Sequence, residues 1–195
     1  MSAVAEFLPK EYGYVALVLV LYCFLNFWMG FQVGKARKMY KVFYPTLYAV
    51  ESENKNAKLF NCIQRGHQNS LEMMPVFFML MILGGIGHPC ISAGLGLMFT
   101  ITRYFYFTGY ATGDPQKRLT IGKFGFLAIL GLMICVISFG IKQYLLVVLV
   151  WFAYTNRKGH MGPVGIQGPP IATKQANLTD CYRSLVPVVA AFDYL

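Results

Sequence analysis

The chain has 195 residues, of which 56% are apolar and only 13% are charged. This composition excludes a disordered chain and argues against an ordinary soluble domain. The net charge is +9. Because the basic residues lie beside apolar runs, this charge indicates membrane topology and not nucleic-acid binding. The five cysteines have no C-x-x-C spacing, so we expect packed thiols and neither a disulfide framework nor a zinc site. A nucleophilic thiol at Cys62 is the alternative.

The first apolar run, from Tyr12 to Gly34, carries no charge and is long enough to cross a bilayer. A cleaved signal peptide is the competing interpretation. Its apolar core would be shorter and would end at a small-residue cleavage site. We therefore expect a first membrane helix over about residues 14–33. The basic cluster Lys35–Lys41 that follows is typical of a cytosolic anchor.

The next two helices are expected to form a hairpin over about residues 60–84 and 91–110. No Asp, Glu, Lys or Arg occurs between Met73 and Thr102, and the middle of this stretch reads Gly84-Gly85-Ile86-Gly87-His88-Pro89. Glycines followed by proline interrupt a helix. We interpret His88 as a turn residue at the membrane surface.

A fourth helix is expected over about residues 121–141, after a turn rich in Gly, Asp and Pro. A second apolar run, Tyr144–Tyr154, continues beyond it. One helix from Ile121 to Tyr154 would be about 51 Å long, whereas a bilayer core is about 30 Å thick. The helix therefore either protrudes or breaks near residues 140–143. Residues 143–195 are expected to form a tail, mostly coil after the apolar run, with Asn177 as an N-glycosylation acceptor.

These spans predict an all-α integral membrane protein, an up-down four-helix transmembrane bundle over residues 1–142 followed by an irregular C-terminal tail. In such a bundle the loops after the first and third helices lie at the same end. Both loops are basic, so the positive-inside rule places that end in the cytosol.

Polar residues from separate helices are expected to meet at this end. Arg65, Asn69 and Glu72 share one face of a helix, and Arg103, Tyr106 and Tyr110 share a face of the next. Glu72 and Tyr106 lie about 22 and 25 Å from the hairpin turn, at similar depth. Together with Arg118 and the cluster around Arg37, they suit an anionic, peptide-like molecule that meets a lipophilic one. An aromatic belt and charges that only set topology would explain the same residues.

Several segments resemble a known family, the membrane-associated proteins of eicosanoid and glutathione metabolism (MAPEG). The likeness covers about residues 7–142 and is strongest to its type 3 microsomal glutathione transferase branch. The matching segments are Lys10–Gly13, Lys35–Val42, Phe60–Asn69, Gly87–Pro89 and Gly109–Arg118. The resemblance implies a homotrimer in the endoplasmic reticulum membrane, with glutathione bound between protomers near the cytosolic face.

The same resemblance implies roles for individual residues. Arg118 corresponds to an arginine that stabilises the glutathione thiolate, with Lys117 as the fallback because the loop differs in length. The glutathione-binding positions are matched by Arg37, Lys38, Arg65, His67, Asn69, Glu72, Tyr106 and Tyr110. His67 replaces a glutamine of the leukotriene-C-forming synthases. Met73 replaces a tyrosine, so one glutathione contact is missing or substituted.

The implied activity is a glutathione transferase that conjugates glutathione to lipophilic electrophiles. Glutathione-dependent reduction of lipid hydroperoxides and leukotriene-C formation belong to the same chemistry. Glutathione is the co-substrate and no metal takes part. The alternatives are a lipid-binding scaffold of the same family without catalysis, and a structural membrane protein.

Overall fold

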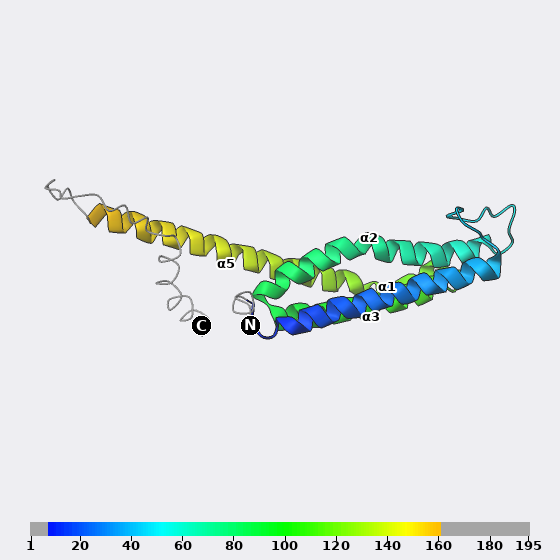
Figure 1. Ribbon diagram of the computed structural model, residues 1–195, viewed down its shortest axis with the longest axis horizontal. Helices are drawn as coiled ribbons and strands as arrows, with labels where there is room; N and C mark the ends of the chain where they lie inside the picture. The colour runs from blue at the N-terminus through cyan, green and yellow to red at the C-terminus, as the bar shows by residue number, and fades with distance from the viewer. Residues whose placement is uncertain (1–7, 161–195) are drawn as a thin grey trace, which may run out of the picture. The chain divides into compact units, whose positions relative to one another are not determined.

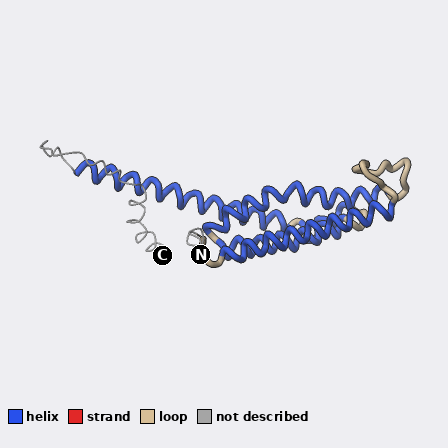
Figure 2. The backbone as a smooth tube through the Cα atoms, viewed as in Figure 1, coloured by secondary structure: helices blue, strands red, loops and turns tan. Residues whose placement is uncertain are grey.

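The computed structural model describes residues 8–160. Every regular element in this range is a helix, as Figure 2 shows. The long helices, labelled in Figure 1, are α1 (Tyr12–Tyr40), α2 (Ala57–Gly87), α3 (Pro89–Tyr110) and α5 (Phe124–His160). A 3-10 helix η2 (Pro115–Arg118) and the single turn α4 (Leu119–Gly122) connect α3 to α5. The predicted all-α class is confirmed.

The core is built from aromatic side chains of three helices. Tyr22 of α1, Phe77 of α2 and Phe99 of α3 are fully or almost fully buried, and their ring centroids lie 4.5–5.8 Å apart. The Tyr22 hydroxyl donates to the Ser70 carbonyl at 3.0 Å, which satisfies the one polar atom of this side chain. Ala128 and Leu132 of α5 belong to the same buried cluster. Four helices therefore enclose one core, as the bundle prediction requires.

Within residues 8–160, three helices are long and apolar enough to cross a membrane: Tyr12–Tyr40, Ala57–Gly87 and Phe124–Asn156. Helix α3 is not among them. It has 22 residues, about 33 Å of helix, and it packs against α1 and α2. Its length therefore matches the roughly 30 Å hydrocarbon core.

The helices extend beyond the apolar runs that predict them. Helix α1 continues through the basic cluster to Tyr40, because Lys, Arg, Ala and Met are good helix formers. It ends where Lys41 adopts a left-handed conformation and donates its backbone N–H to the Arg37 carbonyl. The length of the apolar run thus predicts the membrane segment but underestimates the length of the helix.

The α2–α3 hairpin turn consists of one residue, His88. Its N–H donates to the Gly84 carbonyl at 2.8 Å, and its own carbonyl accepts from Ser92 N at 2.9 Å. Pro89 then occupies the first turn of α3, where its missing N–H costs nothing. The predicted hairpin is confirmed, with a tighter turn than expected.

Helix α5 passes through residues 140–143 without a break, so the first of the two alternatives for this region, one long helix, describes the chain. The chain divides into two compact units between Trp151 and Phe152, whereas the sequence predicts a boundary after residue 142. The described part of the second unit, residues 152–160, is the end of α5. The rest of the predicted tail, including Asn177, lies outside the described residues.

The loop of residues 41–56 and the turn after α3 lie at the same end of the bundle. Gly113 in that turn has φ of +83°, a conformation that favours glycine. A Cβ at Gly113 would lie 3.0 Å from the Leu59 side chain at the start of α2. The prediction that these two connections share one end is confirmed, and we call it the loop end.

Candidate functional site

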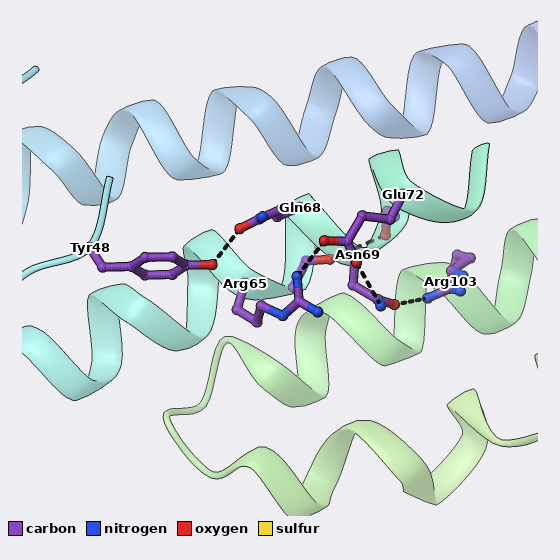
Figure 3. A network of polar contacts seen from close by, with 8 residues as sticks. Tyr48, Arg65, Gln68, Asn69, Glu72 and Arg103 are labelled. Atoms are coloured by element: carbon purple, nitrogen blue, oxygen red, sulfur yellow. Dashed lines mark hydrogen bonds and ion pairs between the residues drawn. The ribbon is translucent and has the colours of Figure 1, made fainter. Parts of the chain in front are cut away.

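A polar network lies on α2 near the loop end (Figure 3). The Arg65 guanidinium pairs with Glu72 Oε1 at 2.6 Å, and Asn69 Nδ2 lies 3.5 Å from Glu72 Oε2. The side chains of Arg65 and Glu72 are 40% and 46% exposed. An ion pair this open contributes little to stability. Both charges thus remain accessible to a ligand.

Arg103 of α3 supports this network from the buried side. The residue is 7% exposed, and its guanidinium donates from Nη1 to Asn69 Oδ1 at 2.8 Å. The guanidinium also lies over the rings of Phe99 and Tyr106, at 5.1 and 4.9 Å from their centroids. A buried cation without a paired carboxylate is costly unless its donors and its flat face are occupied. Arg103 therefore fixes Asn69 and Tyr106 relative to each other.

Arg118 reaches α3 from the connection η2. Its Nη1 donates to the Tyr110 hydroxyl at 2.9 Å, and the guanidinium lies 5.0 Å from the centroid of that ring. The Tyr110 and Tyr106 rings are 5.8 Å apart. Lys117, the fallback for the thiolate-stabilising cation, is exposed. The geometry therefore favours Arg118 as the cation that accompanies the two tyrosines.

Two glycines allow η2 and α4 to approach α3 closely enough for this contact. A Cβ at Gly109 would lie 2.6 Å from the Lys117 carbonyl oxygen. A Cβ at Gly122 would lie 2.9 Å from Tyr106 Cδ2. Any larger residue at position 109 would have to displace the backbone beside Arg118.

The α2 network and the α3–η2 group meet around Tyr106. Its phenol lies within electrostatic range of Arg118, Arg103 and Arg65. Six of the nine predicted site residues thus gather at one place: Arg65, Asn69, Glu72, Tyr106, Tyr110 and Arg118. The group offers cations, a carboxylate, an amide and two phenols beside apolar helix surfaces.

Arg37, a predicted glutathione ligand, is engaged elsewhere. It is 7% exposed and donates to the Thr46 carbonyl at 2.7 Å, to the Val42 carbonyl at 3.4 Å and to Gln64 Oε1 at 3.4 Å. Its guanidinium also lies 4.4 Å from the centroid of the Tyr44 ring. Arg37 therefore holds the 41–56 loop, and its role as a ligand stays a prediction.

The other two predicted ligands also point away from the Arg65–Glu72 face. His67 lies about 200° around the helix from Arg65, and its ring packs beside Gly30 of α1. Lys38 is exposed and lines an open groove along α1 with Lys35, Gly34 and Phe31. Within a single chain neither residue joins the group around Tyr106.

The sequence places Arg103 on the helical face of Tyr106 and Tyr110, as a charge inside an apolar helix, but assigns it no role in the site. Sequence reasoning missed two further residues of this region, Gln68 and Tyr48, because an amide on a helix and a tyrosine in a loop have no distinctive spacing. The Tyr48 hydroxyl donates to Gln68 Oε1 (Figure 3).

Comparison with known proteins gives a consistent result. The MAPEG family model matches residues 15–138. Microsomal glutathione S-transferase 2 of Bos taurus is 31% identical over 136 residues, which cover 67% of this chain and 88% of the relative. The Homo sapiens protein of the same name is also 31% identical, with 67% and 87% covered. The Mus musculus protein is 34% identical over 120 residues, with 61% and 74% covered.

The fold and these matches define an all-α membrane protein of the glutathione-transferase type. The chain belongs to the MAPEG family, as its sequence motifs predict. The three relatives carry the type 2 name, so the stronger likeness to the type 3 branch stays a prediction.

Proposed function

We propose that the protein is a membrane-bound glutathione transferase that conjugates glutathione to lipophilic electrophiles and reduces lipid hydroperoxides with it. One observation carries this proposal. Two groups of residues from separate elements, Arg65–Asn69–Glu72 and Tyr106–Tyr110–Arg118, converge at one end of an apolar bundle. The names of the relatives, microsomal glutathione S-transferases, support the same activity.

The chemistry of the residues matches that of the tripeptide. Glutathione carries two carboxylates, one ammonium and two amide bonds. Arg65 suits a carboxylate, because a guanidinium forms paired hydrogen bonds with it. Glu72 suits the ammonium, and Asn69 suits a peptide amide. Arg37, Lys38 and His67 would complete the set in a homotrimer in which a neighbouring protomer supplies them.

Arg118 is assigned to the sulfur. A thiol with a pKa of about 8.5 is mostly protonated at cytosolic pH, and a guanidinium a few ångströms away stabilises the thiolate. The thiolate attacks an electrophilic carbon, a C–S bond forms, and the leaving group or epoxide oxygen takes up a proton. With a lipid hydroperoxide, two glutathione molecules give glutathione disulfide, an alcohol and water.

The electrophile would enter from the bilayer, since the predicted site adjoins apolar helices. The basic residues around the loop end favour a cytosolic orientation in the endoplasmic reticulum membrane. Glutathione is abundant on that side, so the two substrates would meet at the membrane surface.

A lipid-binding scaffold without catalysis is the second candidate. It is favoured by Met73, which stands where related synthases have a tyrosine ligand and which packs against the core cluster. A site without that phenol could bind lipid and leave the thiol un-ionised.

Activity assays on the purified protein in detergent distinguish the two functions. We expect conjugation of glutathione to a chromogenic acceptor and reduction of a lipid hydroperoxide, both abolished or strongly reduced in Arg118→Ala. Lipid binding without turnover of either acceptor would establish the scaffold instead. Gly94→Ala is the matched control, because a methyl group there meets no neighbouring atom within 4 Å.

A further inference from the structure

Tyr48 is the only part of the 41–56 loop that joins the α2 network drawn in Figure 3. It lies at 37% exposure, and its hydroxyl donates to Gln68 Oε1 on α2. The loop carries polar residues such as Glu51, Glu53 and Asn54, and the proposed function gives it no role. The contact with Gln68 shows that the loop adds a side chain to the site region.

The backbone on both sides of Tyr48 is tethered. Two residues before it, the Thr46 carbonyl accepts from Arg37 Nη1 at 2.7 Å. One residue after it, the Ala49 N–H donates to Asn61 Oδ1 at 2.8 Å, and Asn61 Nδ2 donates to the Ala49 carbonyl at 2.9 Å. An exposed tyrosine on an untethered loop would sample many positions. Here both anchors come from the helices that flank the loop, so the ring is held over α2.

Gln68 connects this ring to the carboxylate of the site. It precedes Glu72 by four residues and therefore lies one helical turn below it. The Gln68 amide lies close enough to stabilise the Glu72 carboxylate, which accepts hydrogen bonds from Arg65 and Asn69. Because the Tyr48 hydroxyl donates to the amide oxygen of Gln68, the amide nitrogen is the group of this side chain that remains to donate to the carboxylate. The α2 residues around this carboxylate are thus held from two sides. Arg103 of α3 contacts Asn69, and Tyr48 of the loop contacts Gln68.

We propose that Tyr48 is a positioning residue for glutathione binding, acting through Gln68 on the Glu72 carboxylate. The inference rests on the proposed function, in which Glu72 binds the single ammonium of the tripeptide. Glu72 is half exposed and lies on a helix surface, so its rotamer is set by its hydrogen-bond partners. Tyr48 fixes the amide of Gln68, one helical turn from this carboxylate. The substrate ammonium would then bind a carboxylate whose side chain is already in the required orientation.

The test measures glutathione binding as well as turnover. Purified Tyr48→Phe, which keeps the ring and removes the hydroxyl, should raise the Kd and the KM for glutathione about three- to tenfold, the range expected from one hydrogen bond. The kcat at saturating glutathione and the melting temperature should not change. A general structural role would lower the melting temperature and alter kcat and KM together.

A double-mutant cycle assigns the effect to Gln68. Gln68→Leu should weaken glutathione binding by a similar factor, and Tyr48→Phe should add nothing in that background, because the two residues act in series. Tyr44→Phe is the matched control. Tyr44 lies in the same loop and is 80% exposed. The phenylalanine that replaces it keeps the ring that Arg37 contacts.

Each result is decisive. An unchanged Kd and KM for glutathione in Tyr48→Phe, with a wild-type protein that binds glutathione, overturns the positioning role alone. Fully additive losses in the double variant also overturn it, since Tyr48 would then act without Gln68. A wild-type protein that binds no glutathione overturns the proposed function, and this inference with it.

Discussion

Replacing Arg118 by alanine should lower turnover most strongly at low pH. The guanidinium Nη1 lies 2.9 Å from the Tyr110 hydroxyl, and the effect can be estimated for a sulfur bound about 5 Å from the charge. At an effective dielectric constant of about 20, this separation corresponds to about 3 kcal/mol of attraction for the thiolate. That energy lowers the thiol pKa by about two units, from about 8.5 to about 6.5.

The sign and size of the effect follow directly. At about pH 7 the thiolate fraction would fall from about three quarters to about 3%, so kcat should drop about twentyfold in Arg118→Ala. Above about pH 9.5 both proteins hold a thiolate, and the difference should disappear. Glutathione affinity should change little, since the other contacts remain.

The assay is kcat for conjugation across the pH range, together with the ultraviolet absorbance of the bound thiolate. Arg118→Lys should retain much of the shift, because it keeps the charge. Lys117→Ala tests the fallback cation and should leave the profile in place. Equal kcat for Arg118→Ala and the wild type at neutral pH would remove Arg118 from the mechanism.

Three further predictions concern the residues that hold the site together. Gly109→Ala should reduce kcat while the protein stays folded, because the added methyl would lie 2.6 Å from the Lys117 carbonyl and displace Arg118; activity equal to that of Gly94→Ala would contradict this. Arg103→Met should lower the melting temperature and raise the KM for glutathione, since a buried hydrogen bond from a charged group contributes about 1.5–3 kcal/mol and Asn69 loses its donor. A normal KM would show that Asn69 needs no support. Asn61→Leu removes two hydrogen bonds to Ala49 and should speed amide hydrogen exchange in residues 41–56 with little change in α2; slow exchange in that loop would argue against the tether.

Much of the fold follows from the distribution of charge. Long uncharged runs predict the membrane helices, and the Gly84–Pro89 interruption predicts the hairpin. The ends of the helices were less predictable. The apolar run of the first helix stops before Lys35, whereas residues with high helix propensity continue the helix to Tyr40. The continuity of α5 across Lys142 likewise reflects backbone hydrogen bonding, which a single charged residue does not interrupt.

The site divides in a similar way. Helical spacing places Arg65, Asn69 and Glu72 on one face, and hairpin geometry brings them to the depth of Tyr106. Helical spacing does not predict that the Arg37 side chain, at the end of α1, bonds the backbone of the loop that follows it. It also gives no information about Tyr48, whose position depends on anchors from two helices. Contacts between a loop and a helix depend on tertiary structure, which a period of 3.6 residues does not encode.

The burial of Arg37 has a consequence for biogenesis. The same guanidinium that orders the loop through Thr46 and Val42 also counts among the charges that orient the chain during insertion. A lysine at position 37 would keep the charge and lose the planar set of donors. Membrane orientation and loop order, which depend on one side chain in the natural sequence, could thus be separated by a single substitution.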